Sequence, residues 1–316
     1  MTTTEVFGGA VAQSGWREFL ASWQHLTPDD LSAADTTTGV SVTLGLYRSS
    51  RGRLVVPHDS PFVPVTIEHG DTVGARRLER RWLSLTERIG QELLHERVAR
   101  PWNLPPGIVD VRGFQQAGFR LESRFTSVVD LPWQETSAVK KVRQRARRAV
   151  TEGFTAARGT DPGEVLRCLT ETEERKHFRY RIDEATLRLG VEILGSDRFR
   201  FYLARASSGE VASARVVICS DDGDALGWVS GTRTRFLASG VQQLMTRATL
   251  EDLSNDGFAT FDWAGVNIPS IASAKEDWGG RLTPFTAAFP RNGWDIAQGA
   301  WHAMGYGRHK IRKAAL

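Results

Sequence analysis

Three strand-like runs follow one another between residues 198 and 234, and they constrain the fold more than any other feature. The runs are RFRFYLARAS, VASARVVICS and ALGWVSGTRT, joined by the short polar turns SGE and DDGD. Turns of this length connect neighbouring antiparallel strands. Helical patterns precede this meander, and a helical pattern at about 241–256 and a strand-like run at 258–265 follow it. The order predicts a mixed α+β domain whose sheet is flanked by helices.

The first half repeats this order loosely. Its predicted elements are a helix at 16–26, strands at 40–49, 53–57 and 61–67, an amphipathic helix at 75–98, a short strand ending near 110, a short helix at 111–118 and a strand at 120–131. The repetition favours an internal duplication, and 316 residues suffice for two domains. We expect an N-terminal domain at 1–135 that ends in the linker LPWQE, and a C-terminal domain at 136–316 with a basic helix at its start and a basic tail.

The net charge of +4 is unevenly distributed, because residues 137–181 carry +6 and residues 281–316 carry +5 against an acidic background. Like charges at helical spacing repel one another, so a run of this kind favours anionic partners. Those partners are either carboxylates of the acidic segment 182–280 or the phosphates of RNA. A basic tail is also often only a solvated chain end. The candidate phosphate ligands are Lys140, Lys141, Arg143, Arg145, Arg147 and Arg148 in the helix, and Arg308, Lys310, Arg312 and Lys313 in the tail.

Several classes of protein are excluded or disfavoured. With 41% hydrophobic and 25% charged residues, the composition is that of a globular chain. Cys168 and Cys219 are too few for a disulfide framework, and the seven histidines are scattered, so we expect neither a metal nor a resident cofactor. The sequence lacks the glycine–serine elbow of hydrolases, the paired histidines of zinc proteases and the Walker loop. No apolar run is long enough to span a membrane, and no secretory signal is recognisable, so we expect a cytoplasmic protein.

Three stretches resemble the Fem family of aminoacyltransferases, which are built from two tandem GNAT-like domains. These stretches are PWQETSAVKKVRQRARRAVTEGF at 132–154, ASGVQQLMTRATLEDLSNDGFATFDWAGVN at 238–267 and IASAKEDWGGRLTPF at 271–285. The resemblance implies an acyltransferase that moves an activated acyl group to an amine. In the best-known members the donor is aminoacyl-tRNA and the acceptor is a peptidoglycan precursor peptide. A smaller amine or peptide acceptor is equally compatible with this sequence, which also lacks the coiled-coil insertion of some Fem ligases.

The identity of the donor depends on one loop. GNAT acetyltransferases hold the pyrophosphate of CoA on a glycine-rich turn before a helix. At the equivalent position this sequence reads RFLASGVQQL, in which Gly240 is present but the paired glycine spacing is lost. We therefore favour an aminoacyl-tRNA donor. The alternatives are an acyl-CoA-dependent N-acyltransferase and a non-catalytic protein that binds RNA or another polyanion.

The resemblance assigns catalysis to Lys275, whose counterpart in the family is the proposed stabiliser of the tetrahedral oxyanion. A surface ion pair with Glu276 or Asp277 is the alternative role. Asp262 lies where a strand is expected to end, and it either orients or deprotonates the amine or caps the following loop.

Five further residues are candidates for substrate binding. Trp263 and Trp278 either line an acyl pocket or pack in the core. Arg175, Tyr180 and Arg181 form a polar cluster after a helix, and they either bind a carboxylate of the acceptor or belong to a solvated helix end. The oligomeric state is not predicted.

Overall fold

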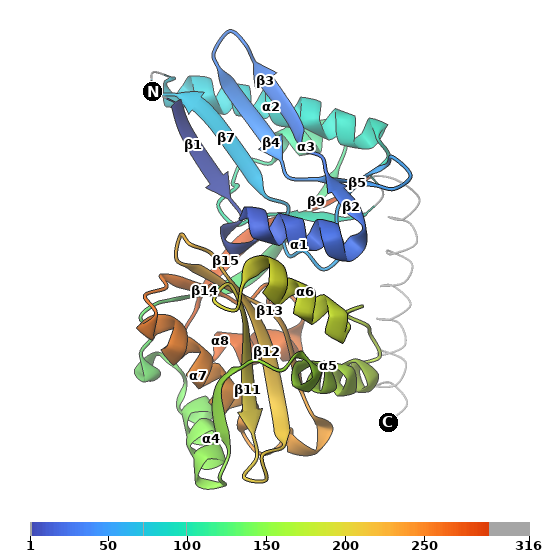
Figure 1. Cartoon of the computed structure of the whole chain (residues 1–316). Coiled ribbons are helices and arrows are strands. Elements are labelled where there is room, and N and C mark those ends of the chain that lie inside the picture. The colour runs from blue at the N-terminus through green and yellow to red at the C-terminus, as the bar shows by residue number, and fades with distance from the viewer. Residues whose placement is uncertain (1, 72, 99, 291–316) are drawn as a thin grey trace, which may run out of the picture.

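The structure is a computed structural model that describes residues 2–71, 73–98 and 100–290. It has two lobes, and the first part of the chain forms most of the upper lobe in Figure 1. That lobe contains an antiparallel sheet with the order β1-β7-β4-β3, formed by β1 (Thr2–Phe7), β3 (Leu31–Asp35), β4 (Val40–Leu44) and β7 (Val65–Gly70). The helices α2 (Ala75–His95) and α3 (Arg112–Ala117) share one buried core with this sheet.

An eight-stranded sheet crosses both lobes in the order β10-β11-β12-β13-β14-β9-β15-β8. Two of its strands come from the first part of the chain, namely β8 (Trp102–Leu104) and β9 (Arg120–Asp130). The others are β10 (Thr155–Gly159), β11 (Phe199–Arg205), β12 (Val211–Cys219), β13 (Asp224–Thr232), β14 (Thr260–Asp262) and β15 (Arg281–Phe289). β13 and β14 run parallel, whereas the other neighbours in the described part of this sheet are antiparallel.

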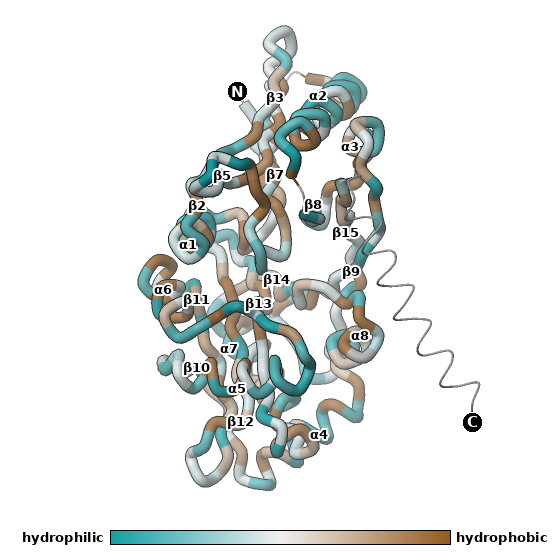
Figure 2. Tube along the Cα trace, turned by 90° about the vertical axis from the view of Figure 1, so that its right-hand side faces the viewer, coloured by the Kyte–Doolittle hydropathy of each residue, from teal (hydrophilic) through white to brown (hydrophobic). Residues whose placement is uncertain are grey.

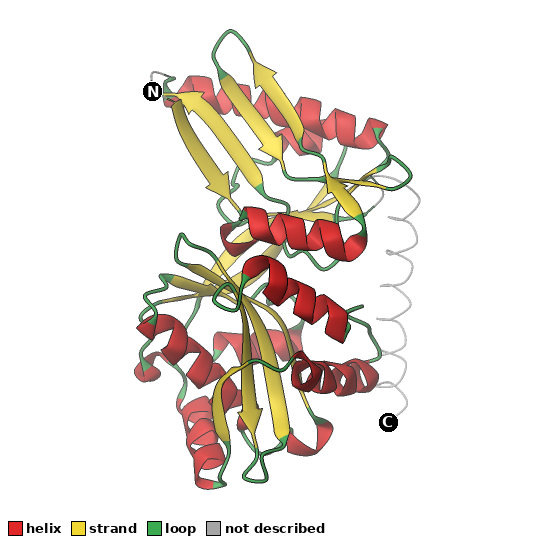
Figure 3. Ribbon diagram, viewed as in Figure 1, coloured by secondary structure: helices red, strands yellow, loops and turns green. Residues whose placement is uncertain are grey.

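Helices cover both faces of this sheet in the lower lobe, as Figure 3 shows. On one face a single core joins the strands to α1 (Ser14–Gln24), α5 (Pro162–Lys176) and α6 (Glu184–Leu194). On the other face a second core contains residues of α4 (Lys140–Thr151) and α7 (Val241–Asn255). The side chain of Asp161 caps the N-terminus of α5 and that of Asp183 caps α6, and such caps set where a helix begins.

The helix α1 connects the lobes, because it belongs to the first part of the chain and packs into the core of the lower lobe. Its Trp16 and Phe19 lie in aromatic contact with Trp228 of β13, and Phe19 also contacts Phe199 of β11. The division into domains at residue 135 stays a prediction. Within the described residues no helix has the length and apolar character needed to span a membrane. A short sheet, β2 (Leu26–Pro28), β5 (Tyr47–Ser49) and β6 (Leu54–Val55), and the helix α8 (Pro269–Glu276) complete the fold.

The mixed α+β class predicted from the sequence is confirmed, and most predicted elements are present. Three of the strands that differ from the prediction have a local reason for doing so. The run at 40–49 breaks at Gly45 into β4 and β5, which lie in different sheets. The short strand expected after the turn at Pro105 and Pro106, ending near residue 110, does not form in the described chain. A strand precedes the turn instead, and this strand, β8, ends at Leu104 because the two prolines lack the N–H groups that a strand needs. β14 ends at Asp262, since Ala264 and Gly265 adopt positive φ angles of 55° and 108° and turn the chain away.

Candidate functional site

The parallel strands β13 and β14 separate after three residue pairs. Their last pair is Leu226 with Asp262, after which β13 continues to Thr232 while β14 ends. Within the described part of the chain, the edge of β13 from Gly227 to Thr232 therefore has no strand beside it where β14 would have continued. We call this gap between the edge of β13 and the end of β14 the strand opening. Because backbone groups at such an edge have no partner strand, they bind side chains or a ligand instead, and the opening is a candidate ligand site.

Side chains from α5 and the loop after it contact the open edge of β13. Arg175 Nη1 donates to the backbone oxygen of Thr232 at 3.0 Å, and Thr172 Oγ1 accepts from the backbone N–H of Thr232 at 3.1 Å. The hydroxyl of Tyr180 donates to the backbone oxygen of Ser230 at 3.4 Å. Two of the predicted substrate-binding residues, Arg175 and Tyr180, thus lie at the strand opening. The guanidinium of Arg175 donates its hydrogen bonds to Thr172, Thr232 and Thr234, so this side chain holds the edge of β13 in place.

Lys275 lies on the other side of the opening, in α8. Its Nζ donates to the backbone oxygens of Trp263 at 2.6 Å and Gly265 at 2.8 Å, in the turn that follows β14. Among the described residues it forms no ion pair, so neither Glu276 nor Asp277 holds it. Burial, followed by the nearby charge of Arg215, lowers the pKa of Lys275 to about 8. The side chain is thus a cation fixed by two carbonyl groups at the end of β14.

Asp262 is the last residue of β14, and its carboxylate is held from two sides. Its Oδ1 accepts from the hydroxyl of Thr126 and, at 2.7 Å, from the backbone N–H of Ala264. Burial raises the pKa of Asp262 to about 6, although Thr126, Ala264 and Lys275 act in the opposite direction. Oδ2 has no hydrogen-bond partner in the part of the chain that the structure describes. Asp262 therefore caps the loop through one oxygen and keeps the other available to accept a proton.

Two tryptophans of the predicted acyl pocket occupy different surroundings. Trp263 is buried in ring contact with Phe261, and its Nε1 has no partner among the described residues. Trp278 packs in the core against Trp133, whose Nε1 donates to the backbone oxygen of Trp278 at 3.2 Å. After Trp278 the chain passes so close to Ser137 that a Cβ at Gly279 would lie 2.5 Å from the Ser137 backbone oxygen.

One functional candidate, Arg215 of β12, was missed by sequence reasoning. It lies in the run VASARVVIC, in which all residues are buried, and it is a charged residue in an otherwise small and apolar strand. That contrast was the available signal. Its guanidinium reaches the ring of Trp263, with 4.8 Å between Cζ and the ring centroid. We call the following group of four residues the opening cluster: Arg215, Trp263, Asp262 and Lys275.

The basic helix α4 is attached to the elements that carry this cluster. The backbone N–H of Val139, just before α4, donates to the backbone oxygen of Asp277 at 2.9 Å, two residues after Lys275. Figure 2 shows α8 above α4 on the same side of the lower lobe. Lys140, Lys141 and Arg145 are exposed and have no ion-pair partner among the described residues, and Arg143 is half-buried without one. Arg147 and Arg148 are exposed and pair with Glu135 and Glu152, respectively.

Gly240 begins α7 in the left-handed conformation, with φ of 81°. A Cβ at this position would lie 2.3 Å from the backbone oxygen of Arg145 in α4. Packing of α4 against α7 therefore accounts for this glycine without a phosphate-binding role. Arg181 is exposed in the loop between α5 and α6. The predicted tail residues Arg308, Lys310, Arg312 and Lys313 lie outside the described residues.

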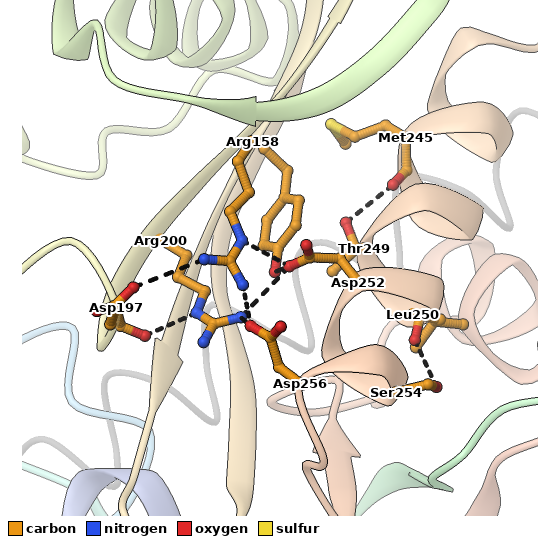
Figure 4. A network of polar contacts seen from close by, with 10 residues as sticks. Arg158, Asp197, Arg200, Met245, Thr249, Leu250, Asp252, Ser254 and Asp256 are labelled. Carbon is orange, nitrogen blue, oxygen red and sulfur yellow. Dashed lines mark hydrogen bonds and ion pairs between the residues drawn. The ribbon is translucent and has the colours of Figure 1, made fainter.

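A hollow of about 760 Å³ lies away from the opening cluster, at the ends of the strands opposite the opening. It is lined in part by Arg198, Arg200 and Asp256, whose charges are already paired: Arg198 with Asp221, and Arg200 with Asp256 at 2.7 Å. Figure 4 shows the network around Arg200. Since these charges compensate one another, we do not assign the chemistry to this hollow. The described residues hold no group of three or more histidine, cysteine or carboxylate side chains suited to a metal ion.

Residues 136–275 match the family model of the acetyltransferase (GNAT) domain. No curated protein sequence matches the chain significantly. Among solved structures, FemX is similar with a TM-score of 0.60 at 11% identity, over 89% of this chain and 92% of FemX. L-PGS from Bacillus licheniformis has a TM-score of 0.52 at 13% identity, over 89% and 92% of the two chains. A C-terminal DUF2156 domain from Agrobacterium fabrum has a TM-score of 0.54 at 12% identity, over 91% and 90%. These likenesses confirm the fold expected from the sequence.

Proposed function

Since this chain carries a GNAT-type acyltransferase domain, we propose that it transfers an aminoacyl group from aminoacyl-tRNA to an amine and forms an amide bond. The observation that carries the choice of donor is the surface of α4, where three exposed cations have no carboxylate partner among the described residues. Phosphates of an RNA backbone would neutralise these cations and release counterions. A backbone hydrogen bond from Val139 to Asp277 ties the start of α4 to the end of α8, so we expect RNA bound on α4 to lie next to the opening cluster.

The chemistry follows from the positions of the two titratable groups. Asp262, as the carboxylate, accepts a proton from the acceptor amine through Oδ2. The amine then attacks the acyl carbonyl, and Lys275 stabilises the negative charge that develops on the carbonyl oxygen. The acceptor is an amine-bearing small molecule or peptide that enters past Tyr180 and the exposed Arg181, whose guanidinium suits a carboxylate.

The alternative donor, acyl-CoA, keeps the same chemistry and is favoured by the name of the matching domain family. Against it stands Gly240, whose conformation is explained by the contact with α4. A protein that only binds RNA would need none of the opening cluster.

The decisive experiment supplies labelled aminoacyl-tRNA or labelled acetyl-CoA with a cell extract as the source of amine acceptors. We expect label to pass from tRNA to an amide product. A double variant, Lys141→Gln with Arg145→Gln, should weaken tRNA binding and reduce the slope of log affinity against log salt by about 2. The matched control removes two exposed arginines from other helices, Arg167→Gln with Arg188→Gln, and should leave both unchanged. Transfer from acetyl-CoA alone would contradict the proposed donor.

A further inference from the structure

The side chain of Arg215 extends across the strand opening on the face of the sheet that α7 covers. Arg215 lies on β12 opposite Ser230 of β13, four positions beyond Leu226, where β13 and β14 are last paired. Its guanidinium is bonded to Thr246 of α7 and lies over the ring of Trp263, just beyond the end of β14. The side chain therefore spans from β12 past the open edge of β13 to the end of β14, on the face that α7 covers.

The guanidinium is buried without a compensating charge. Arg215 is 3% exposed, and its Nη2 donates to Thr246 Oγ1 at 2.9 Å. Nη1 is buried and has no partner among the described residues, and the same holds for Nε1 of neighbouring Trp263. No carboxylate within the described residues lies within ion-pair distance of Arg215. Burial lowers the pKa of Arg215 to about 10, which still leaves it charged at neutral pH. A buried cation of this kind is unfavourable unless another partner supplies an acceptor.

Lys275 places a second positive charge nearby, because its Nζ donates to the backbone oxygen of Trp263, the residue whose ring the Arg215 guanidinium contacts. The charge of Arg215 accordingly contributes to lowering the pKa of Lys275. Asp262 is the carboxylate of the opening cluster, and its Oδ1 accepts hydrogen bonds from Thr126 and Ala264. The four residues of the opening cluster therefore include two cations and one carboxylate, and Asp224, whose charge also acts on Asp262, lies at the start of β13. The net positive charge of the cluster is complementary to an anionic oxygen that forms transiently during the reaction.

We propose that Arg215 Nη1 acts with Lys275 Nζ to bind the anionic oxygen that forms on the acyl carbonyl during transfer. This role rests on the proposed acyl transfer, but not on which donor is used. When the amine nitrogen bonds to the carbonyl carbon, the C=O π electrons move to the carbonyl oxygen, whose negative charge the two cations stabilise. Collapse restores C=O and breaks the bond to the ribose oxygen or thiolate. The proton that the amine loses passes to Asp262 and then to solvent, and the leaving ribose oxygen or thiolate sulfur takes a proton from water.

The first test measures stability, which needs no substrate. Arg215→Met removes an uncompensated buried charge, so we expect its Tm to equal or exceed that of the parent protein. Arg200→Met is the matched control, since Arg200 is a similarly buried strand arginine that is paired with Asp256. Its Tm should fall by roughly 5 °C or more. A fall of the same size in Arg215→Met would assign Arg215 to the fold and overturn the proposal.

The second test measures the site. With whichever donor supports transfer, Arg215→Met should lower kcat by about 100-fold or more, with a smaller change in KM, and Arg215→Lys should recover part of the loss. Unchanged kcat in folded Arg215→Met overturns the proposal. If no donor supports transfer, inorganic sulfate serves as a tetrahedral anion, compared with sodium chloride at equal ionic strength. Sulfate should raise the Tm of the parent protein more than that of Arg215→Met, and equal shifts would overturn the role of Arg215 independently of the proposed function.

Discussion

Two arginines on neighbouring strands of one sheet are buried to a similar degree but have opposite surroundings. Arg200 of β11 is 5% exposed and lies among Asp252, Asp256 and the backbone oxygen of Asp197, as Figure 4 shows. Arg215 of β12 is 3% exposed, and among the residues that the structure describes its guanidinium has one hydroxyl partner and leaves Nη1 unpaired. Burial of a charge is tolerated where carboxylates compensate it. The network around Arg200 therefore contributes to stability, whereas the opening cluster holds unsatisfied groups that are available for chemistry.

The largest expected effect lies in the opening cluster. Lys275→Ala should lower kcat by about 100-fold to 1000-fold, since it removes a fixed cation from the position where negative charge develops. The assay is transfer of labelled acyl group under saturating donor. Lys176→Ala is the control, because Lys176 is an exposed lysine at the end of α5. Wild-type kcat in Lys275→Ala would remove the catalytic role of this lysine.

The next effect lies in the network around Arg200. Asp252 accepts from Tyr202 Oη at 2.6 Å, from Arg158 Nε at 2.7 Å and from Arg200 at 3.3 Å. Asp252→Ala should lower the free energy of unfolding by about 2–4 kcal/mol, because it leaves buried Arg200 with one fewer carboxylate. Chemical denaturation measures this change. Asp221→Ala breaks an exposed pair with Arg198 and should cost less than about 1 kcal/mol. Equal losses of unfolding free energy in the two variants would contradict the distinction between the buried network and the exposed pair.

The pH dependence of transfer sharpens the same comparison. Asp262 must be ionised to accept a proton, so the rate should rise as pH increases through about 6, where burial and the charge of Asp224 place its pKa. Lys275 must be protonated, so the rate should fall as pH increases through about 8. A bell-shaped profile of kcat/KM is the expected result. Arg215→Met should move the alkaline limb upward, since it removes a repelling charge. A flat profile between pH 5 and 9 would exclude Asp262 and Lys275 from these roles.

The sequence predicts much of the fold because its signals are local. The apolar spacing of α2, the turns of the β11–β13 meander and the basic run of α4 each lie within one segment. β15 and β10 carry weaker local patterns and were not predicted, and β15 is defined by its pairing with β9, more than 150 residues away in sequence. The opening cluster could be predicted only in part for the same reason. Lys275 and Asp262 lie in recognisable motifs. Arg215 becomes a candidate only from the three-dimensional structure, which shows its buried guanidinium without a carboxylate partner among the described residues.

The smallest effect tests whether the exposed cations of α4 act as a binding surface. Arg148 is 69% exposed and pairs with Glu152 one helical turn away, so Glu152→Gln should change the free energy of unfolding by less than about 0.5 kcal/mol. The same change frees Arg148, and tRNA affinity at low salt should rise by about twofold to threefold. Glu184→Gln is the matched control, since it frees Arg188 in the same spacing on α6 and alters the net charge equally. If both variants bind tRNA equally well, net charge and not the surface of α4 attracts the RNA. A larger gain in Glu152→Gln would locate the contact on α4, beside the opening cluster.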